Sequence, residues 1–369
     1  MRITVLGAGP VGRAVAYRAL IGGIFDQVVI VDIDDKRLGL ARKLCGEGVI
    51  TVRADVLKEL DMVIRGSDVV SCTLPGSISF GVCRDVLKMG ISVVDSAYMP
   101  QDPFLLDDIA RDHDVVYVPD AGFAPGVSNI LVGYLSSKLR SVDRVEIYVG
   151  GLPIRPEEPF FHSVNWSISD FVEEYLRPAR IIRDGRVISV NPLEKIGRVT
   201  IRGIEYEWFY TDGLRTLLRT VRARDMSEKT LRYPRHLERM RFLRDIGLLS
   251  NDRIEIGGNR ISCKEIVVAV LRRTMYKPDM RDRLVLYVIV EGDGKKFEAY
   301  MEEEYDTSIG LSAMAKATGF TNAILSEMVV DVIHDRGVFP PEYFGMRYMD
   351  YFMDKISRHI KVDITQGSG

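Results

Sequence analysis

A glycine-rich turn followed by an acidic residue is the first feature of the chain that indicates chemistry. Gly7, Gly9 and Gly12 lie in a short stretch after an apolar run, and Asp32 follows 20 residues after Gly12. Glycines at this spacing permit a tight turn, let the backbone approach a pyrophosphate, and let a helix pack close to a strand. The first turn of that helix offers unpaired N–H groups to phosphates. We therefore expect the residues that bind a dinucleotide to include Gly7, Gly9, Pro10, Val11 and Gly12.

Asp32 indicates which dinucleotide the turn binds. A carboxylate at the end of the second strand accepts hydrogen bonds from the adenosine ribose hydroxyls. It also repels a 2′-phosphate, so the sequence predicts NAD rather than NADP, although Lys36 and Arg37 weaken that preference. Asp55, which follows a third apolar run, is expected to approach the adenine. A glycine turn without a ligand is the alternative.

A parallel sheet is needed to position these residues. Apolar runs indicate strands, and predicted helices at 13–21, 37–44, 80–89 and 104–111 alternate with them; the runs are 2–6, 28–31, 49–52, 68–72, 91–94 and 115–118. This alternation predicts an α/β fold with a Rossmann doubly wound parallel sheet, in which ligands bind at the carboxyl ends of the strands. The later loops should complete the cofactor site, through Leu74, Pro75, Ser96, Tyr98, Gly122 and Phe123.

The middle of the chain has a different pattern of apolar and polar residues. Segment 145–149 alternates apolar and polar residues, and segment 284–290 precedes a hairpin signal at 292–294. A second hairpin signal lies at 184–185. These patterns are typical of antiparallel strands. We predict an α+β second domain, about 127–306, with a mixed or antiparallel sheet for substrate binding and dimerisation. The NAD-binding domain would comprise 1–126 and about 307–369, with the active site in the cleft between domains. Residues 366–369 are expected to be a loose tail.

The composition limits the class of protein. A formal net charge of −2 provides no basic field for nucleic acid, and no apolar run reaches the roughly 18 residues that span a bilayer. The four cysteines lack the spacing of a zinc site. We expect a cytoplasmic protein that uses no metal and has no nucleic-acid or membrane partner.

Motifs along almost the whole chain resemble the saccharopine dehydrogenase superfamily, and within it the compact lysine 6-dehydrogenases. The matching stretches are 95–98, 120–129, 150–153, 166–167, 211–214, 229–234, 317–319 and 337–342. One position departs from the pattern: Arg235 lies between Pro234 and His236, where the family usually has a glycine. That glycine would serve a turn or a close approach to substrate, so the departure leaves the exact substrate open.

The resemblance implies oxidative deamination of the L-lysine ε-amino group with NAD. The product would be 2-aminoadipate 6-semialdehyde, which cyclises to piperideine-6-carboxylate, and the assembly a homodimer or higher homo-oligomer. An alkylammonium, with a free pKa of about 10.4, must lose a proton before hydride leaves, so the site needs a base or surroundings that depress that pKa. Asp95, Asp120 and His236 are the candidate catalytic groups; a structural role is the alternative for each.

A lysine substrate also needs partners for its α-carboxylate and its apolar stem. Arg232 is the first choice for the carboxylate because a guanidinium binds it in a bidentate manner, with Arg215 and Arg235 behind it. Trp166 is expected to wall the stem, and Asp212 is a further candidate base. The substrate-binding candidates are Tyr98, Trp166, Asp212, Arg232, Tyr233 and His236. An ordinary core or surface role is the alternative for these residues.

Two other functions remain open. One is a saccharopine or carboxynorspermidine-type reductase or dehydrogenase, which would keep the fold and cofactor but hold a longer, charged product. The compact middle domain argues modestly against saccharopine. The other is a non-catalytic NAD-binding regulatory protein, against which the many polar residues at the expected cleft argue.

Overall fold

The computed structural model describes residues 1–278 and 280–368, and the chain divides into two units. The first unit comprises Met1–Lys138 and Asp306–Lys361, and the second comprises Leu139–Tyr305 and the chain from Val362. Two segments differ from the predicted domain limits of 126/127 and 307–369. Helix α6 (Val127–Ser137) belongs to the first unit, and strand β18 (Val362–Ser368) belongs to the second. Positions 279 and 369, which the predicted domains include, lie outside the described residues.

Packing explains both differences. Helix α6 lies so close to helix α12 (Pro341–Ile356) that a Cβ on Gly133 would be 2.2 Å from the Glu342 carbonyl oxygen. Residues 366–368 of the expected loose tail instead belong to strand β18, which pairs with strand β16 (Lys295–Glu304) as far as Ser368. Strand pairing of this kind cannot be predicted from a short polar sequence.

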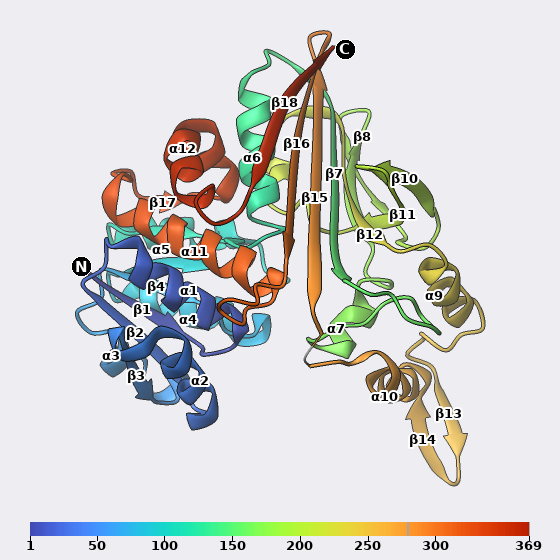
Figure 1. Ribbon diagram of the computed structural model, residues 1–369, viewed down its shortest axis with the longest axis horizontal. Helices are drawn as coiled ribbons and strands as arrows, with labels where there is room; N and C mark the ends of the chain where they lie inside the picture. Colours follow the sequence, from blue (N-terminus) through green and yellow to red (C-terminus); the bar gives the residue numbers. More distant parts are fainter. Residues whose placement is uncertain (279, 369) are drawn as a thin grey trace. The chain divides into compact units, whose positions relative to one another are not determined.

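A seven-stranded parallel sheet forms the centre of the first unit (Figure 1). Its strand order is β17-β6-β5-β4-β1-β2-β3. The strands are β1 Arg2–Leu6, β2 Gln27–Asp32, β3 Val49–Arg53, β4 Val69–Cys72, β5 Ser92–Asp95, β6 Val116–Val118 and β17 Gly337–Val338. The chain moves outward from β1 in both directions, so β1 and β4 flank the point at which ligands bind in such sheets. The predicted doubly wound sheet is confirmed.

Helices cover this sheet on both faces. They are α1 Pro10–Gly22, α2 Asp35–Cys45, α3 Val56–Ile64, α4 Gly76–Lys88, α5 Asp107–Asp112, α6, α11 Ala313–Asp331 and α12, with 3₁₀ turns at Gly46–Gly48 and Pro103–Leu106. Helices α1 and α11 lie side by side in Figure 1, and a Cβ on Gly319 would be 2.5 Å from that of Ala14. Asn322 of α11 accepts from Ser71 Oγ at 2.5 Å and donates to the Val94 carbonyl at 3.3 Å. These bonds hold α11 over β4 and β5.

The second unit contains a nine-stranded mixed sheet. Its main order is β10-β11-β12-β7-β15-β16-β18, and the β8–β9 hairpin joins at β12. Only β7 and β12 run parallel among its described pairs. The strands are β7 Val142–Pro153, β8 Ala179–Arg183, β9 Arg186–Val190, β10 Gly197–Ile201, β11 Ile204–Thr211, β12 Ala223–Arg232, β15 Asp282–Gly292, β16 Lys295–Glu304 and β18. Both predicted hairpins form, and the predicted second sheet is confirmed.

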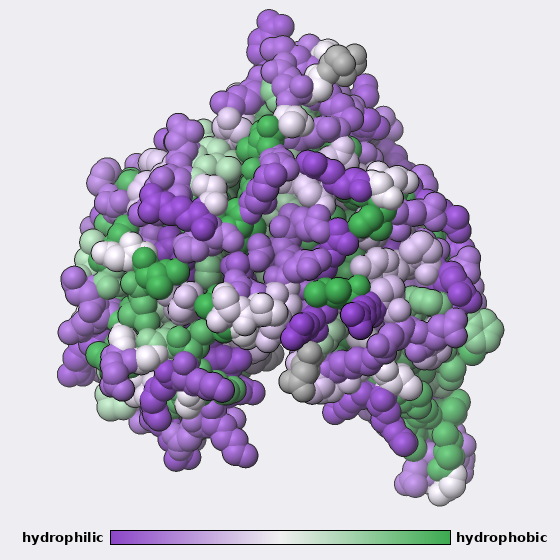
Figure 2. Space-filling model, in the orientation of Figure 1, coloured by the Kyte–Doolittle hydropathy of each residue, from purple (hydrophilic) through white to green (hydrophobic). Residues whose placement is uncertain are grey.

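Short helices and a separate hairpin complete this unit. They are α7 Ile168–Glu173, α8 Leu217–Thr220, α9 His236–Asp245, α10 Cys263–Met275, β13 Arg253–Ile256 and β14 Asn259–Ser262. Apolar side chains gather on the surface of the hairpin and α10 (Figure 2), where Ile254, Ile256 and Val270 are 43–53% exposed. Within the described residues, no helix has both the length and the apolar character that a membrane crossing requires.

Candidate active site

The glycine turn lies at the carboxyl end of β1. Gly7 has φ 101°, a conformation that favours glycine, and its N–H donates to the Val31 carbonyl at 2.8 Å. A Cβ on Gly12 would be 1.8 Å from the Gly7 carbonyl oxygen, so the turn tolerates no larger residue there. A Cβ on Gly9, in contrast, would meet no atom within 4 Å. The backbone at Gly9 therefore borders open space.

Helix α1 begins directly behind this turn. Gly9 is its N-cap and supplies no side-chain acceptor, and no acidic residue lies in its first turn. The N–H groups of a first helical turn have no partner within the helix. The uncapped end of α1 is therefore suited to bind an anion such as a diphosphate.

Asp32 connects the turn to the end of β2. Its Oδ2 accepts from the Ala8 N–H at 2.8 Å and its Oδ1 accepts from the Asp34 N–H at 2.9 Å. The Arg37 Nη1 lies 3.7 Å from Oδ2. A carboxylate has about four lone-pair sites, so Asp32 retains acceptor capacity for ribose hydroxyls. The sequence did not indicate its second task, which is to hold the turn.

Thr73 is a turn residue that the sequence analysis missed. Its Oγ1 donates to the Leu6 and Gly7 carbonyls, at 2.9 and 3.1 Å. A Cβ on Gly7 or Gly12 would also contact this hydroxyl. The only sequence signal was a hydroxyl residue directly after β4.

The loops after β4 and β5 meet at the same edge of the sheet. Pro75 is the N-cap of α4, and a Cβ on Gly76 would be 2.0 Å from the Tyr98 carbonyl oxygen. The Ser96 N–H donates to the Cys72 carbonyl at 3.1 Å. The structure therefore places Leu74, Pro75, Ser96 and Tyr98 on loops beside the strands that flank the glycine turn.

Two other predicted cofactor residues have local structural tasks. Asp55 caps α3 by accepting from the Leu57 N–H at 3.1 Å. Phe123 is 2% exposed in the loop after β6, where a Cβ on Gly126 would be 1.8 Å from the Gly122 carbonyl oxygen. Glycines at 122 and 126 thus allow the loop to fold back on itself.

Asp95 is the candidate base whose pKa burial brings close to neutral pH. Its carboxylate is fully buried and accepts from Ser79 Oγ at 2.9 Å and from the Ala97 N–H at 3.0 Å. Burial is the main cause that raises the pKa of Asp95 to about 7, and the charge of Asp120 adds to it. Asp120 has φ 53° and is 2% exposed. A carboxyl group with a pKa near 7 is suited to proton exchange at neutral pH.

His236 and Arg232 belong to a buried polar cluster in the second unit, together with Tyr175 and Glu174. Arg232 Nε donates to the Tyr175 hydroxyl at 2.9 Å, and that hydroxyl lies 2.8 Å from His236 Nε2. Burial lowers the pKa of His236 to about 3, so the ring is neutral. Its Nδ1 lies 2.7 Å from the Phe160 carbonyl, which assigns the proton to Nδ1 and makes Nε2 the acceptor.

Each of the three guanidinium nitrogens of Arg232 donates to an acceptor within the protein. Besides the bond to Tyr175, Nη1 donates to the Leu231 carbonyl at 2.9 Å and Nη2 donates to Glu174 Oε2 at 2.5 Å. Arg232 is 3% exposed. Because Arg232 is buried and each of its nitrogens already donates within the protein, its role in this structure is to hold the cluster together.

The remaining substrate candidates lie around this cluster or apart from it. Trp166 is 40% exposed and packs edge-on against Phe171, which also contacts Tyr175. Tyr233 lies 6.0 Å from Tyr206, ring centroid to ring centroid. Asp212 forms a bidentate ion pair with Arg180, at 2.9 and 2.8 Å. Arg232 and His236 are joined through their hydrogen bonds to the Tyr175 hydroxyl.

Glu228 is a buried carboxyl group that the sequence analysis missed. It is 3% exposed and accepts from Thr211 Oγ1 at 3.1 Å, while its Oε2 has no hydrogen-bond partner among the described residues. Burial is the main cause that raises the pKa of Glu228 to about 8. No periodic pattern distinguishes this glutamate from those that face solvent on neighbouring strands.

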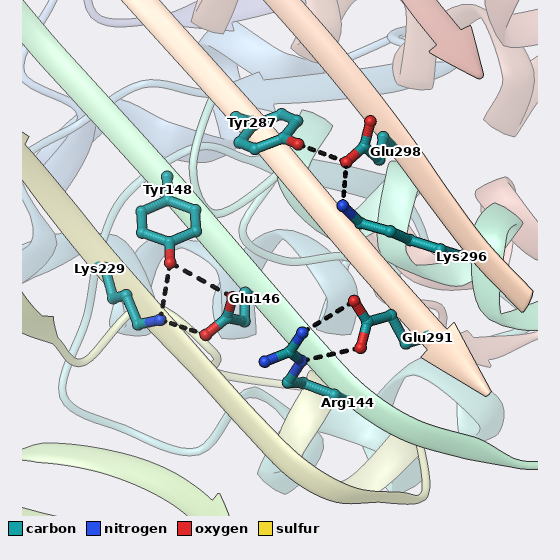
Figure 3. A network of polar contacts seen from close by, with 8 residues as sticks. All are labelled: Arg144, Glu146, Tyr148, Lys229, Tyr287, Glu291, Lys296 and Glu298. Atoms are coloured by element: carbon teal, nitrogen blue, oxygen red, sulfur yellow. Dashed lines mark hydrogen bonds and ion pairs between the residues drawn. The ribbon is translucent and has the colours of Figure 1, made fainter. Parts of the chain in front are cut away.

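A second polar network lies across β12, β7, β15 and β16 (Figure 3). Lys229 binds Glu146 and lies 3.0 Å from the Tyr148 hydroxyl. Arg144 forms a bidentate pair with Glu291, at 3.0 and 2.8 Å. Lys229 and Arg144 have anionic partners on the same sheet, so the network stabilises the pairing of these strands.

One family model and one solved structure agree with this architecture. The saccharopine dehydrogenase C-terminal domain family matches residues 122–361. Apo saccharopine dehydrogenase (L-Glu forming) from Saccharomyces cerevisiae superposes with a TM-score of 0.83 at 18% identity, over 99% of each chain. GenD2 from gentamicin A biosynthesis, solved with NAD, gives a TM-score of 0.43 at 10% identity, over 100% of this chain and 97% of that chain. Because the family match covers more than half of its length, the chain belongs to the saccharopine dehydrogenase family.

Proposed function

We propose that this protein is an NAD-dependent dehydrogenase that oxidatively deaminates the ε-amino group of L-lysine. The observation that carries the proposal is the uncapped end of α1 behind the glycine turn, beside Asp32, in a member of the saccharopine dehydrogenase family. An amino-acid dehydrogenase of this family needs a dinucleotide site and a proton acceptor, and the first unit contains candidates for both.

The turn fits a dinucleotide diphosphate. Gly9 borders open space, so a phosphate can approach the backbone there. Asp32 is positioned to accept from ribose hydroxyls, and its charge disfavours a 2′-phosphate. The side chain of Arg37 is 57% exposed and lies 3.7 Å from Asp32, and its positive charge weakens this preference for NAD over NADP.

The chain's own residues would accept the proton that the substrate ammonium loses. NAD, when bound, supplies a hydride acceptor. In our proposal the proton of the substrate ammonium passes to Asp95, whose pKa is raised to about 7 mainly by burial and further by the charge of Asp120. His236 acts as a positioning residue for Tyr175, since its low pKa and its two hydrogen bonds keep it neutral.

Saccharopine is the second candidate substrate. The yeast protein that shares the fold along its whole length is a saccharopine dehydrogenase. Such a substrate would need more cationic partners than lysine does, because it carries three carboxylates. A carboxynorspermidine-type amine remains a further candidate.

The assay is NADH formation with L-lysine, D-lysine, ornithine, saccharopine and polyamines. We expect turnover with L-lysine, at a rate that falls by orders of magnitude in Asp95→Asn while NAD affinity stays within about twofold. Asp61→Asn on the exposed face of α3 is the matched control and should behave as wild type. Turnover of saccharopine alone would replace the lysine assignment, and NAD binding without turnover of any amine would favour a regulatory protein.

A further inference from the structure

A pocket of about 520 Å³ in the second unit shares only Tyr175 with the buried polar cluster. It is formed by the chain after α7, by the segment between β9 and β10, and by α9. Its volume is in the range of small-molecule sites, about 300–1,000 Å³. The lining residues are Tyr175, Leu176, Asn191, Pro192, Leu193, Glu194, Arg241 and Arg244.

Arg241 is the residue with an unmet hydrogen-bonding need. Its Nε is buried and has no hydrogen-bond partner in the part of the chain that the structure describes. This Nε is closed to solvent even with the pocket empty, but no hydrogen bond or ion pair joins Arg241 to another described residue, so its outer Nη groups can donate to an anionic ligand. Arg244, one turn later on the same helix, is held by Asp245 at 2.6 Å.

Glu194 places an opposite charge at the same pocket. It is exposed, and no ion pair joins it to Arg241 or Arg244 among residues 1–278 and 280–368. A guanidinium and a carboxylate that line one pocket without contact leave room for a ligand that carries both charges. A simple anion, such as phosphate, would instead approach Glu194 unfavourably.

The rest of the lining suits the other parts of such a ligand. Leu176, Pro192, Leu193 and the Tyr175 ring provide apolar walls. Asn191 adds an amide that both donates and accepts. We propose that this pocket binds a free α-amino acid, whose carboxylate accepts from Arg241, whose ammonium donates to Glu194, and whose side chain lies against the apolar wall. The proposal goes beyond the oxidation of lysine and does not depend on NAD.

Tyr175 connects this pocket to the buried cluster. Its ring lines the pocket, while its hydroxyl contacts Arg232 and His236. An amino acid in the pocket therefore contacts the residue that anchors the cluster. Occupancy should consequently stabilise the second unit against unfolding.

The test is calorimetric titration of the full-length, cofactor-free protein with L-leucine and L-glutamate, which share the α-amino-acid group but differ in side chain. We expect saturable binding of at least one. N-acetyl-leucine and leucinamide, or the corresponding glutamate derivatives, lack one charge each and should bind at least about tenfold more weakly. Arg241→Gln and Glu194→Gln should each weaken binding by a similar factor, since each removes one charged partner.

The controls separate the pocket from general effects. Arg272→Gln removes an exposed arginine of α10 and should leave binding unchanged. Arg241→Lys keeps the charge and should restore part of the affinity lost in Arg241→Gln, while thermal unfolding checks that each variant is folded. Absence of binding by both amino acids, equal binding of either singly charged derivative, or full binding by folded Arg241→Gln would overturn the proposal. Because neither L-lysine nor NAD is present, these outcomes do not depend on the proposed dehydrogenase activity.

Discussion

The glycine turn of the first unit and the Arg232 cluster of the second unit use polar groups in opposite ways. The turn ends in an uncapped helix and borders open space at Gly9. In the cluster, Arg232, Tyr175 and His236 satisfy one another out of contact with water. Groups left available are suited to binding, and groups already paired are suited to holding a fold. Substitutions in the turn should therefore change affinity, and substitutions in the cluster region should change stability.

The largest expected effect concerns Glu228, the carboxyl group beside this cluster that folding leaves poorly solvated. Its pKa rises on folding from 4.5 to about 8, so the folded state binds the proton more tightly than the unfolded state. Its contribution to stability is complete below pH 4.5, declines as the pH rises, and is lost above about pH 8. Glu228→Gln does not titrate and should remove this decline, which amounts to at most about 5 kcal/mol over the whole range.

Urea unfolding at a series of pH values between 5 and 8 measures this difference. Glu205→Gln, at an exposed glutamate of β11, is the control and should keep the wild-type slope. Parallel stability curves for wild type and Glu228→Gln would mean that Glu228 is solvated in the folded protein.

Arg232→Met tests whether the cluster supports the fold. The substitution removes the partner of Glu174 and a donor to Tyr175. Loss of one member of a buried pair costs about 3–5 kcal/mol, and we expect about 3 kcal/mol because Glu174 retains some solvent contact. Glu174 is 32% exposed and Arg232 is 3% exposed. Denaturant unfolding provides the measurement, with exposed Arg253→Met as control; a loss as small as the control's would contradict the structural role.

Gly12→Val tests the other side of the comparison. A Cβ at this position would be 1.8 Å from the Gly7 carbonyl oxygen, so the turn must change shape. We expect NAD affinity to fall by at least about 100-fold, or about 2.7 kcal/mol. Gly39→Val on the surface of α2, where a Cβ meets no atom within 4 Å, is the matched control for affinity. Equal NAD affinity in Gly12→Val and wild type would remove the turn from the cofactor site.

The smallest expected effect is at Arg235. The residue has φ 78°, a left-handed conformation that favours glycine, the residue that the resemblance led us to expect there. Left-handed backbone costs a side-chain-bearing residue about 1–2 kcal/mol, whereas glycine adds about 0.4–1 kcal/mol of unfolded-state entropy. Arg235→Gly should therefore raise the free energy of unfolding by about 0.5 kcal/mol, while Arg235→Val should lower it. A clear loss of stability in Arg235→Gly would show that the contact with Phe161 matters more than the backbone.

The sequence predicted the turn well because its information is local. Gly7, Gly9 and Gly12 lie within one strand–turn–helix unit, and Asp32 ends the next strand. Thr73 was missed because its contact with that turn spans more than 60 residues. Strand β17 was missed because two residues cannot show a pattern.

The cluster was harder to predict for the same reason. Arg232 and His236 were identified, but their shared partner Tyr175 lies 57 and 61 residues away. Only tertiary packing brings the three side chains together and gives each nitrogen of the arginine an acceptor within the protein. A motif shows which residues matter, whereas burial decides whether they bind a ligand or one another.

Direct titration of the wild-type protein with NAD and with NADP tests the central claim, which is that the turn after β1 binds a dinucleotide and Asp32 selects it. We predict saturable binding of NAD, at least about tenfold tighter than NADP, a difference of about 1.4 kcal/mol. Asp32→Asn should narrow this difference. Absence of binding by both dinucleotides would contradict the account.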